Sequence, residues 1–155
     1  MSERLEDDYE GVCWLKLKTC FKCRKIVGGY GIGNALLTED RINFLSMIDT
    51  ENGIIKDPHH QLFGSSVKGA VLVFPGAIGS SVGAYAIYSL KVNAAAPAAI
   101  ICSNKADITT ASGCAISNIP LVDMLDNSSF FTVSSGMEVK VDADSKIVSV
   151  TNQTV

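Results

Sequence analysis

The feature that most constrains the fold is an apolar run that stops at a proline and turns directly into a helical pattern. Residues 69–75, GAVLVFP, carry no charge, as in a strand that is buried on both faces of a sheet. The chain then turns through the glycine-containing residues 76–79. Beyond Ser80 and Ser81, apolar residues recur at helical spacing as far as Val92. A buried strand that leads through a short turn into a helix predicts an α/β fold.

The same order of elements is repeated along the centre of the chain. Residues 98–102, AAIIC, form a second apolar run, and residues 107–117 predict a second helix. A third apolar run, IPLVD, follows at residues 119–123. Strands that alternate with helices in this way favour a parallel βαβαβ unit.

Both flanks of this centre are rich in strand patterns. Residues 137–150 alternate around a turn at 142–145, which predicts a C-terminal β-hairpin. Earlier in the chain, short strands are expected at residues 14–19, 24–29, 34–38 and 53–57.

The length of 155 residues fits a single domain. We place this domain at residues 12–150. It follows a polar, acidic extension, residues 1–11, that we expect to be disordered, and it precedes a C-terminal tail at residues 151–155.

The charge distribution argues against two classes of partner. The net charge is -3 and no basic run interleaves with aromatic residues, so we expect no nucleic-acid ligand. The longest apolar region, residues 82–102, is interrupted by Lys91, Asn93 and Pro97, so we expect no membrane association. The acidic N-terminus does not resemble a signal peptide, and we predict a cytoplasmic protein.

Five cysteines, an odd number, argue against a disulfide framework in such a protein. Cys20 and Cys23 form a Cys-x-x-Cys motif, with Cys13 seven residues before it. A fourth ligand nearby, or a strand that leads into a helix, would be expected for a metal or thioredoxin-like site. We expect reduced cysteines and no metal ligands in this chain, with a metal or redox role as the alternative.

Two further motifs have structural explanations. The glycine-rich residues 28–34, GGYGIGN, depart from the dinucleotide-binding pattern because its last glycine position is occupied by Asn34. We expect a tight turn between two strands there. His59 and His60 are the only histidines, and we expect them in a solvated turn.

The segment around the two serines permits three interpretations. Residues 79–83 match Gly-x-Ser-x-Gly, which would make Ser81 a hydrolase nucleophile, with His59 or His60 completing a triad. Both histidines precede the serine, whereas the hydrolases with this motif place the histidine after it. A serine here also fits a helix N-cap.

The third interpretation uses the backbone of the same turn. Free N–H groups at Gly79, Ser80 and Ser81, together with the helix dipole, would bind a carboxylate or phosphate. The same groups would stabilise a serine alkoxide, and Ser80 would then act as a base.

The order of the segments is similar to that of a known family. The chain between residues 25 and 144 resembles the small, swivelling subunit of the aconitase X family. The resemblance rests on the stretches at residues 25–57, 66–90, 96–123 and 136–144, which contain NALLTEDRINF, VFPGAIGSSVGAY, AIICSNKADITTASG and GMEVKVDAD.

This resemblance implies a swivelling β/β/α domain with a β-rich, barrel-like half. It implies a heteromeric, archaeal-type hydro-lyase whose large subunit holds an iron-sulfur cluster, of the [4Fe-4S] type, as Lewis acid. The implied reaction removes water from (R)-5-phosphomevalonate to give trans-anhydromevalonate 5-phosphate in isoprenoid biosynthesis. The alternatives are a related dehydratase for another hydroxy acid such as a hydroxyproline, and a non-catalytic swivelling interaction domain.

The resemblance also implies roles for individual residues. Ser80 matches the proton-accepting serine, and Gly79, Ser81 and Gly83 match the substrate-binding positions of the same motif.

Two parts of the chain depart from the family pattern. Ala77 and Ile78 occupy a turn that usually carries basic residues, and residues 1–23, with three of the cysteines, lie outside the resemblance.

Overall fold

The structure is a computed structural model that describes residues 3–6, 15–126 and 133–154. The described strands form one nine-stranded sheet in the order β1-β2-β9-β8-β4-β5-β6-β7-β3. The strands are β1 (Glu3–Glu6), β2 (Leu15–Lys22), β3 (Arg24–Val27), β4 (Tyr30–Leu37), β5 (Val71–Phe74), β6 (Ala99–Cys102), β7 (Leu121–Asp123), β8 (Glu138–Asp142) and β9 (Ile147–Thr154). The helices are α1 (Phe44–Met47), α2 (Gly83–Val92) and α3 (Ile108–Ser117).

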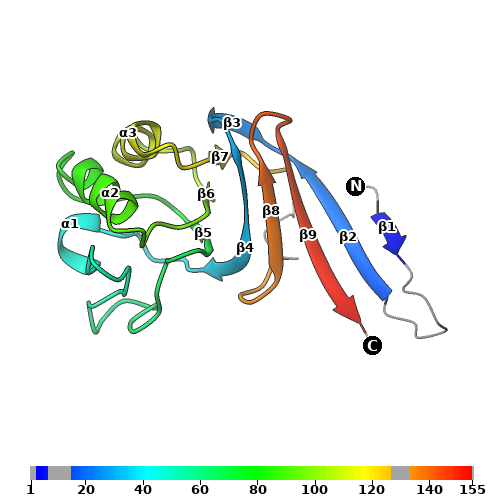
Figure 1. Cartoon of the computed structure of the whole chain (residues 1–155), viewed down its shortest axis with the longest axis horizontal. Coiled ribbons are helices and arrows are strands. Elements are labelled where there is room, and N and C mark those ends of the chain that lie inside the picture. The colour runs from blue at the N-terminus through cyan, green and yellow to red at the C-terminus, as the bar shows by residue number, and fades with distance from the viewer. Residues whose placement is uncertain (1–2, 7–14, 127–132, 155) are drawn as a thin grey trace.

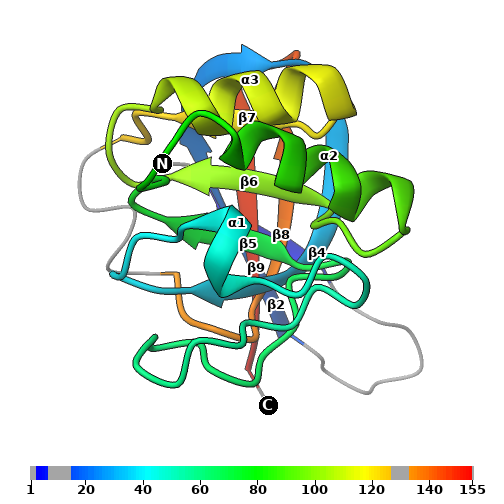
Figure 2. The ribbon, with the colours of Figure 1, turned by 90° about the vertical axis from the view of Figure 1, so that its left-hand side faces the viewer.

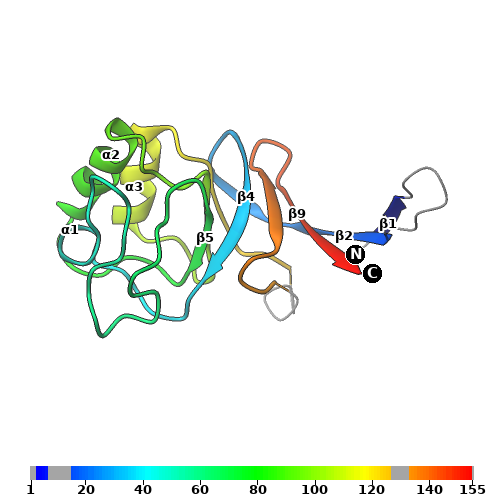
Figure 3. The ribbon, with the colours of Figure 1, turned by 60° about the horizontal axis from the view of Figure 1, so that its bottom comes forward.

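The elements are arranged in a β/β/α order of layers (Figure 1). The three helices lie on one side of β5, β6 and β7, and Figure 2 shows them in front of these strands. Strands β8, β9 and β2 lie on the opposite side. Figure 3 shows that β1, the start of β2 and the end of β9 extend away from the helices as a separate arm.

The central βαβαβ unit is confirmed. Strand β5 pairs in parallel with β4 on one side and with β6 on the other, and β6 pairs in parallel with β7. The C-terminal hairpin is also confirmed, because β8 and β9 pair antiparallel from Asp142 and Ile147 at the turn.

The sheet curls so that β2, next to one end of the strand order, continues almost directly into β3 at the other end. Strand β2 pairs with β9, and β3 pairs with β7, yet only Cys23 separates β2 from β3. The Lys22 N–H donates to Asp126 Oδ2 at 3.2 Å, and the Asp126 N–H donates to the Lys22 carbonyl oxygen at 3.1 Å. These contacts give the β-rich half its barrel-like form.

Strand β5 is buried on both faces and separates two hydrophobic cores. Val71 and Val73 point into the curled sheet, where they pack with side chains of β6, β8 and β9. Leu72 and Phe74 point toward the helices and pack with residues of α1, α2 and α3. Burial of each such side chain contributes about 1.5–3 kcal/mol. The apolar run therefore joins both halves of the molecule.

The predicted turn at residues 28–34 is wrong for most of its length. Only Gly29, with φ 124°, turns the chain; Gly31 and Gly33 lie inside β4. A Cβ on Gly31 would overlap the carbonyl oxygen of Ala98, and a Cβ on Gly33 would overlap that of Gly69. These two glycines let β4 approach the segments that lead into β6 and β5, which is why the strand tolerates them.

Several boundaries also differ from the sequence expectations. Residues 53–57 form no strand; Ile55 and Ile54 make isolated bridges to Ile48 and Ser66. The short helix α1 was not predicted, because its four residues are too few to show a periodicity.

The ends of the chain differ as well. In the extension expected to be disordered, the structure describes residues 3–6, and these form β1 on the edge of β2. Strand β9 continues past residue 150, where a tail was expected, because β2 provides backbone partners as far as Thr154. The rest of residues 1–11, and Cys13, lie outside the described residues.

Candidate functional site

The turn after β5 lies beside the segment that connects β4 to α1. The N–H of Ile42 donates to the Gly76 carbonyl oxygen at 3.2 Å, and the N–H of Ile78 donates to the Ile42 carbonyl oxygen at 3.1 Å. Ile42 and Ala77 thus form a parallel bridge that extends the pairing of β4 with β5. The turn that carries the serines is therefore held against a second strand end.

Ser80 and Ser81 are both exposed, but they differ in hydrogen bonding. Ser80 Oγ accepts a hydrogen bond from the Val82 N–H at 3.1 Å. The residue at the N-cap of α2 is Val82, and it makes no side-chain cap. The predicted serine cap is therefore wrong for the assigned N-cap position, although Ser80 accepts a backbone N–H just before α2 begins.

Three consecutive backbone donors are open at this turn. Within the described part of the chain, the N–H groups of Gly79, Ser80 and Ser81 donate no hydrogen bond. They lie at the N-terminal end of α2, where the helix dipole favours negative charge. Open N–H groups in such a position can stabilise an oxyanion. These open donors are what an anion-binding turn requires, and anion binding at this turn stays a prediction.

The two glycines of the motif have different surroundings. Gly79 is exposed and has φ 97°, and a Cβ there would lie 2.6 Å from Asn43 Nδ2. Gly83 is buried in α2, where a Cβ would lie 3.1 Å from Thr109 Cγ2. Its N–H donates to the Ser80 carbonyl oxygen at 3.0 Å. Gly83 therefore allows α2 to pack on α3 and lies beneath the exposed surface of the turn.

Asp107 fixes the turn to the start of α3. Its Oδ1 accepts from the Ala77 N–H at 2.9 Å and from Thr110 Oγ1 at 2.8 Å. Its Oδ2 caps the helix by accepting from the Thr110 N–H at 2.9 Å. One carboxylate thus links β5, the turn and α3, so the position of Ser80 depends on a residue from the next crossover.

A cavity of about 470 Å³ opens next to this turn. It lies at the carboxyl ends of β4, β5 and β6, the edge of a parallel sheet where ligands commonly bind. Its lining consists of Leu37, Thr38, Glu39, Arg41, Pro75, Ser103 and Asn104. Arg41 brings a positive charge to a region in which the turn itself has none.

The histidines do not support a hydrolase triad. His60 is buried, and its Nδ1 accepts from the Leu62 N–H at 3.0 Å, so its Nε2 donates to the Arg41 carbonyl oxygen at 3.1 Å. Both ring nitrogens are therefore engaged away from Ser81. The expectation of a solvated turn holds for exposed His59 and is wrong for His60, which supports the backbone of Arg41.

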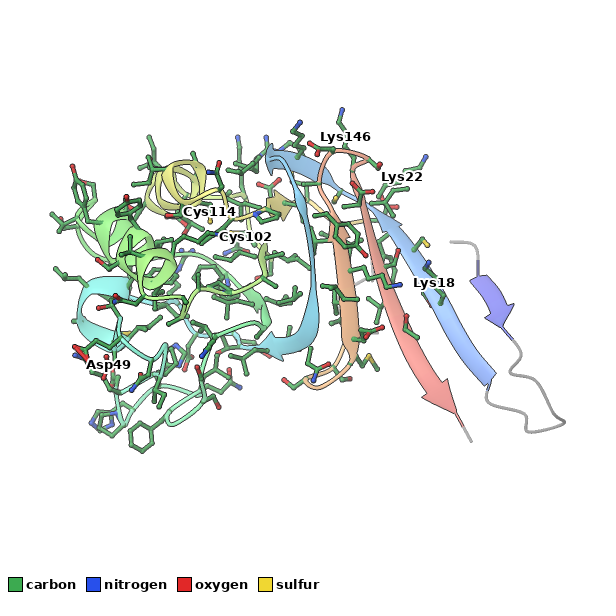
Figure 4. The ribbon with its side chains drawn as sticks, in the orientation of Figure 1. Lys18, Lys22, Asp49, Cys102, Cys114 and Lys146 are labelled. Atoms are coloured by element: carbon green, nitrogen blue, oxygen red, sulfur yellow. The ribbon has the colours of Figure 1, made fainter. Side chains whose placement is uncertain are left out.

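The cysteines do not fit an iron-sulfur cluster in the described part of the chain. No group of three or more His, Cys, Asp or Glu residues there is arranged to hold a metal ion. Burial, followed by the charge of Asp107, raises the pKa of Cys102 to about 12, whereas a metal ligand must be a thiolate. Cys102 ends β6 and Cys114 lies in α3, and both are buried in the core between the sheet and the helices (Figure 4).

The Cys-x-x-Cys motif lies on extended chain. Cys20 is in β2, with Sγ 3.6 Å from Ser149 Oγ, and Cys23 follows the end of that strand. Residues three apart on a strand are separated by about 10 Å, which is too far for a disulfide. Burial, followed by the charges of nearby carboxylates, raises the pKa of Cys23 to about 11. These surroundings do not favour a redox motif.

Sequence reasoning did not identify Arg41, Asn43 or Asp107. Arg41 and Asn43 reach the turn only through the pairing of Ile42 with Ala77, which connects residues 35 positions apart along the chain. Asp107 could have been found as an N-cap from the helical pattern after it, but its bond to Ala77 depends on the packing of two crossovers.

The described helices are all too short or too polar to cross a membrane.

Comparison with known proteins gives consistent results for the whole domain. The aconitase X swivel domain family matches residues 20–150. The phosphomevalonate dehydratase small subunit of Methanothrix thermoacetophila is 45% identical over 127 residues, which are 82% of this chain and 91% of that protein. The protein of the same name from Thermococcus kodakarensis is 46% identical over 124 residues, covering 80% of this chain and 90% of the relative.

A solved structure supports the same assignment. The crystal structure of Thermococcus kodakaraensis aconitase X in its holo-form matches with a TM-score of 0.79 and 42% identity, over 85% of this chain and 98% of that one. The order of layers, the parallel centre of the sheet and the match over most of the sequence all support the same family assignment. The chain belongs to the aconitase X swivel domain family.

Proposed function

We propose that this chain is the small subunit of a heteromeric dehydratase that converts (R)-5-phosphomevalonate to trans-anhydromevalonate 5-phosphate. Its relatives carry the name phosphomevalonate dehydratase small subunit over more than three quarters of this chain. The observation that carries the chemistry is the exposed Ser80 in a turn with three open N–H donors.

In this mechanism Ser80 Oγ takes the proton from the carbon adjacent to the substrate carboxylate. The electron pair of the broken C–H bond forms the double bond, and the C–O bond to the hydroxyl group breaks. The hydroxyl group leaves with the electron pair of the C–O bond and takes up one proton from solvent to become water, and Ser80 returns the proton removed from carbon to solvent. Negative charge develops on the carboxylate, where N–H donors such as those of residues 79–81 are favourable.

The hydrogen bond at Ser80 supports a role as base. The Val82 N–H donates to Ser80 Oγ at 3.1 Å, and it stabilises the alkoxide more strongly than the neutral hydroxyl. Ser81 lacks such a bond within the described structure, so we assign it to substrate binding through its backbone. Gly79 contributes to the site by adopting the positive φ that the turn requires, and Gly83 by allowing α2 to pack closely on α3.

We assign the iron-sulfur cluster expected for the family to the large subunit. The described cysteines are separated between the curled sheet and the α3 side of the sheet, and the pKa of Cys23 and of Cys102 is raised.

Exposed apolar side chains around the serines support a partner on this face. Ile78 and Val82, which flank the serines, are 43% and 45% exposed, and Ile108, next to Asp107, is 77% exposed. Leu45 and Tyr85 are exposed at a second cavity of about 390 Å³ between α1 and α2. A large subunit that covers this face would exclude water from Ser80.

Co-expression with the large subunit and an assay of phosphomevalonate dehydration test this proposal. Ser80→Ala should lower kcat by about 10²–10⁴-fold, because it removes the proton acceptor. Ser81→Ala is the matched control at the neighbouring position and should retain turnover within about tenfold. Unchanged kcat in Ser80→Ala, or turnover of a hydroxyproline in place of phosphomevalonate, would contradict the proposal.

A further inference from the structure

The turn that carries the serines has no positive charge of its own. Residues 75–81, PGAIGSS, contain no lysine or arginine, although the proposed substrate carries a carboxylate and a phosphate. The structure supplies a cation from a different part of the chain. Arg41 Nη1 would lie 3.1 Å from a Cβ on Gly76, so the guanidinium group lies directly against the turn.

Arg41 makes no ion pair with a carboxylate in the described part of the chain. Within residues 15–126 and 133–154, the ion pairs are Arg24–Asp123 and Lys25–Asp144, and none involves Arg41. The oxygens of the nearby Asp107 carboxylate accept from backbone and hydroxyl donors, and within the described structure none accepts from Arg41. The guanidinium group is exposed and keeps its donors available for a ligand.

The cavity beside Arg41 suits an anion with several oxygen atoms. Ser103 and Asn104, which follow β6, line it together with Arg41 and offer hydroxyl and amide donors. The charge of Arg41 extends to the end of β6, since it partly opposes the burial that raises the pKa of Cys102. Glu39 is the one carboxylate in the lining, and its side chain is at the exposed rim.

We infer that Arg41 binds the phosphate of the substrate in this cavity, while the open N–H groups of the serine turn hold its carboxylate. The inference rests on the proposed function and adds a second anchoring point. Residues 76–79 span at most about 10 Å at the rise of an extended chain. Arg41, against Gly76, and the open N–H groups from Gly79 onward are therefore close enough for the two ends of one five-carbon acid phosphate to reach both. Arg41 would thus select phosphorylated substrates and orient the carbon chain toward Ser80.

His60 positions this arginine from behind. Its Nε2–H bond to the Arg41 carbonyl oxygen and the Leu62 N–H bond to its Nδ1 connect the backbone of residue 41 to a buried part of the loop. The backbone of Arg41 is therefore held on two sides, by His60 and by the pairing of Ile42 with the turn.

Two measurements on the assembled enzyme test the inference. In steady-state kinetics, Arg41→Ala should raise KM for phosphomevalonate about 10- to 100-fold, the effect of losing a charge-assisted hydrogen bond, with a smaller change in kcat. Arg41→Lys should recover part of the loss, because it keeps the charge without the planar fork. In calorimetric titration with inorganic phosphate, Arg41→Ala should weaken binding by a similar factor.

Lys22→Ala is the matched control, because it removes one positive charge from β2, in the layer away from the helices (Figure 4). It should change neither KM nor phosphate binding. Equal phosphate binding by wild type and Arg41→Ala, or no binding by wild type, would overturn the inference. So would an equal loss of affinity for mevalonate without its phosphate. The titration does not depend on turnover, so a failure of the proposed reaction would remain distinguishable from a failure at Arg41.

Discussion

Two regions of the molecule place an arginine near an aspartate, and they use the pair in opposite ways. At the β3–β7 edge, Arg24 Nε and Nη2 donate to Asp123 at 2.8 and 2.7 Å, and the Asp123 side chain is 0% exposed. At the carboxyl ends of β4 and β5, Arg41 lies near Asp107, but the carboxylate bonds to Ala77 and Thr110 instead.

The difference separates a structural pair from a binding group. Asp123 also accepts from the Ala106 N–H at 2.7 Å, so the Arg24–Asp123 pair holds β3, β7 and the β6–α3 loop together. Asp107 anchors the other end of the same loop to the serine turn. Asp123 pairs with Arg24, whereas the oxygens of Asp107 accept from Ala77 and Thr110, so Arg41 makes no ion pair in the described structure and keeps its N–H donors for a ligand.

The largest expected effect on stability comes from removing Arg24, and the removal of Arg41 is the comparison. Arg24→Ala leaves Asp123 buried without its cation and should lower the free energy of unfolding by about 3 kcal/mol. Arg41→Ala should change it by less than about 0.5 kcal/mol, because an exposed side chain is removed. Urea denaturation of both variants measures the difference. Equal destabilisation would show that the two regions are used alike.

Removal of Asp107 should combine a structural and a functional loss. Asp107→Ala removes the cap of α3 and the acceptor for the Ala77 N–H, and should lower the free energy of unfolding by about 1–2 kcal/mol. Because the serine turn loses its tether, kcat of the assembled enzyme should also fall. Asp107→Asn, which keeps one acceptor oxygen, is the comparison variant. Full activity in Asp107→Ala would exclude a positioning role.

The pH dependence of stability should report the Arg24–Asp123 pair. Burial favours the neutral acid, but the hydrogen bonds from Arg24 and Ala106 and the charge of Arg24 outweigh it and lower the pKa of Asp123. A lowered folded-state pKa means that the stabilisation is complete above the unfolded-state pKa, about 3.9, and is lost as the pH falls through the folded-state value. Wild type should therefore lose more stability than Asp123→Asn as the pH falls from about 6 to about 3. Parallel curves in urea titrations would contradict this assignment.

The smallest expected effect concerns thiol reactivity. Burial raises the pKa of Cys23 and Cys102 to about 11 and about 12, and raises that of Cys114 as well. Thiolates are the reactive form, so these three cysteines should be alkylated slowly in the folded chain at neutral pH and rapidly in urea. Mass spectrometry of iodoacetamide-treated protein locates the modified residues. Rapid alkylation of Cys102 would contradict its burial beneath the helices.

How much of the fold could be predicted depended on how far apart along the chain the interacting residues lie. Strand β5 and helices α2 and α3 follow from periodicity within about ten residues of sequence, and the hairpin follows from alternation around one turn. The strand assignment failed at Gly31 and Gly33, because a glycine pattern looks like a turn unless the carbonyl groups of Ala98 and Gly69 are known to lie against it.

The turn at the centre of the candidate site was predictable from local sequence, and the residues that surround it were not. Ser80 and the open N–H groups of its turn follow from a local strand-turn-helix pattern. The interpretation of His60 failed because its two hydrogen-bond partners, Leu62 and Arg41, are defined only in the folded loop.

The sequence by itself determined the parallel centre, the serine turn and, through the order of its segments, the family. Each of these depends on residues that are close together along the chain, where side-chain periodicity and backbone preference act directly. Only the tertiary structure decided that Arg41 meets the turn, that Asp107 and Asp123 serve the scaffold, and that Gly83 lies beneath the surface. These contacts join separate crossovers, and the packing of whole layers, which no local pattern encodes, brings them within hydrogen-bonding distance.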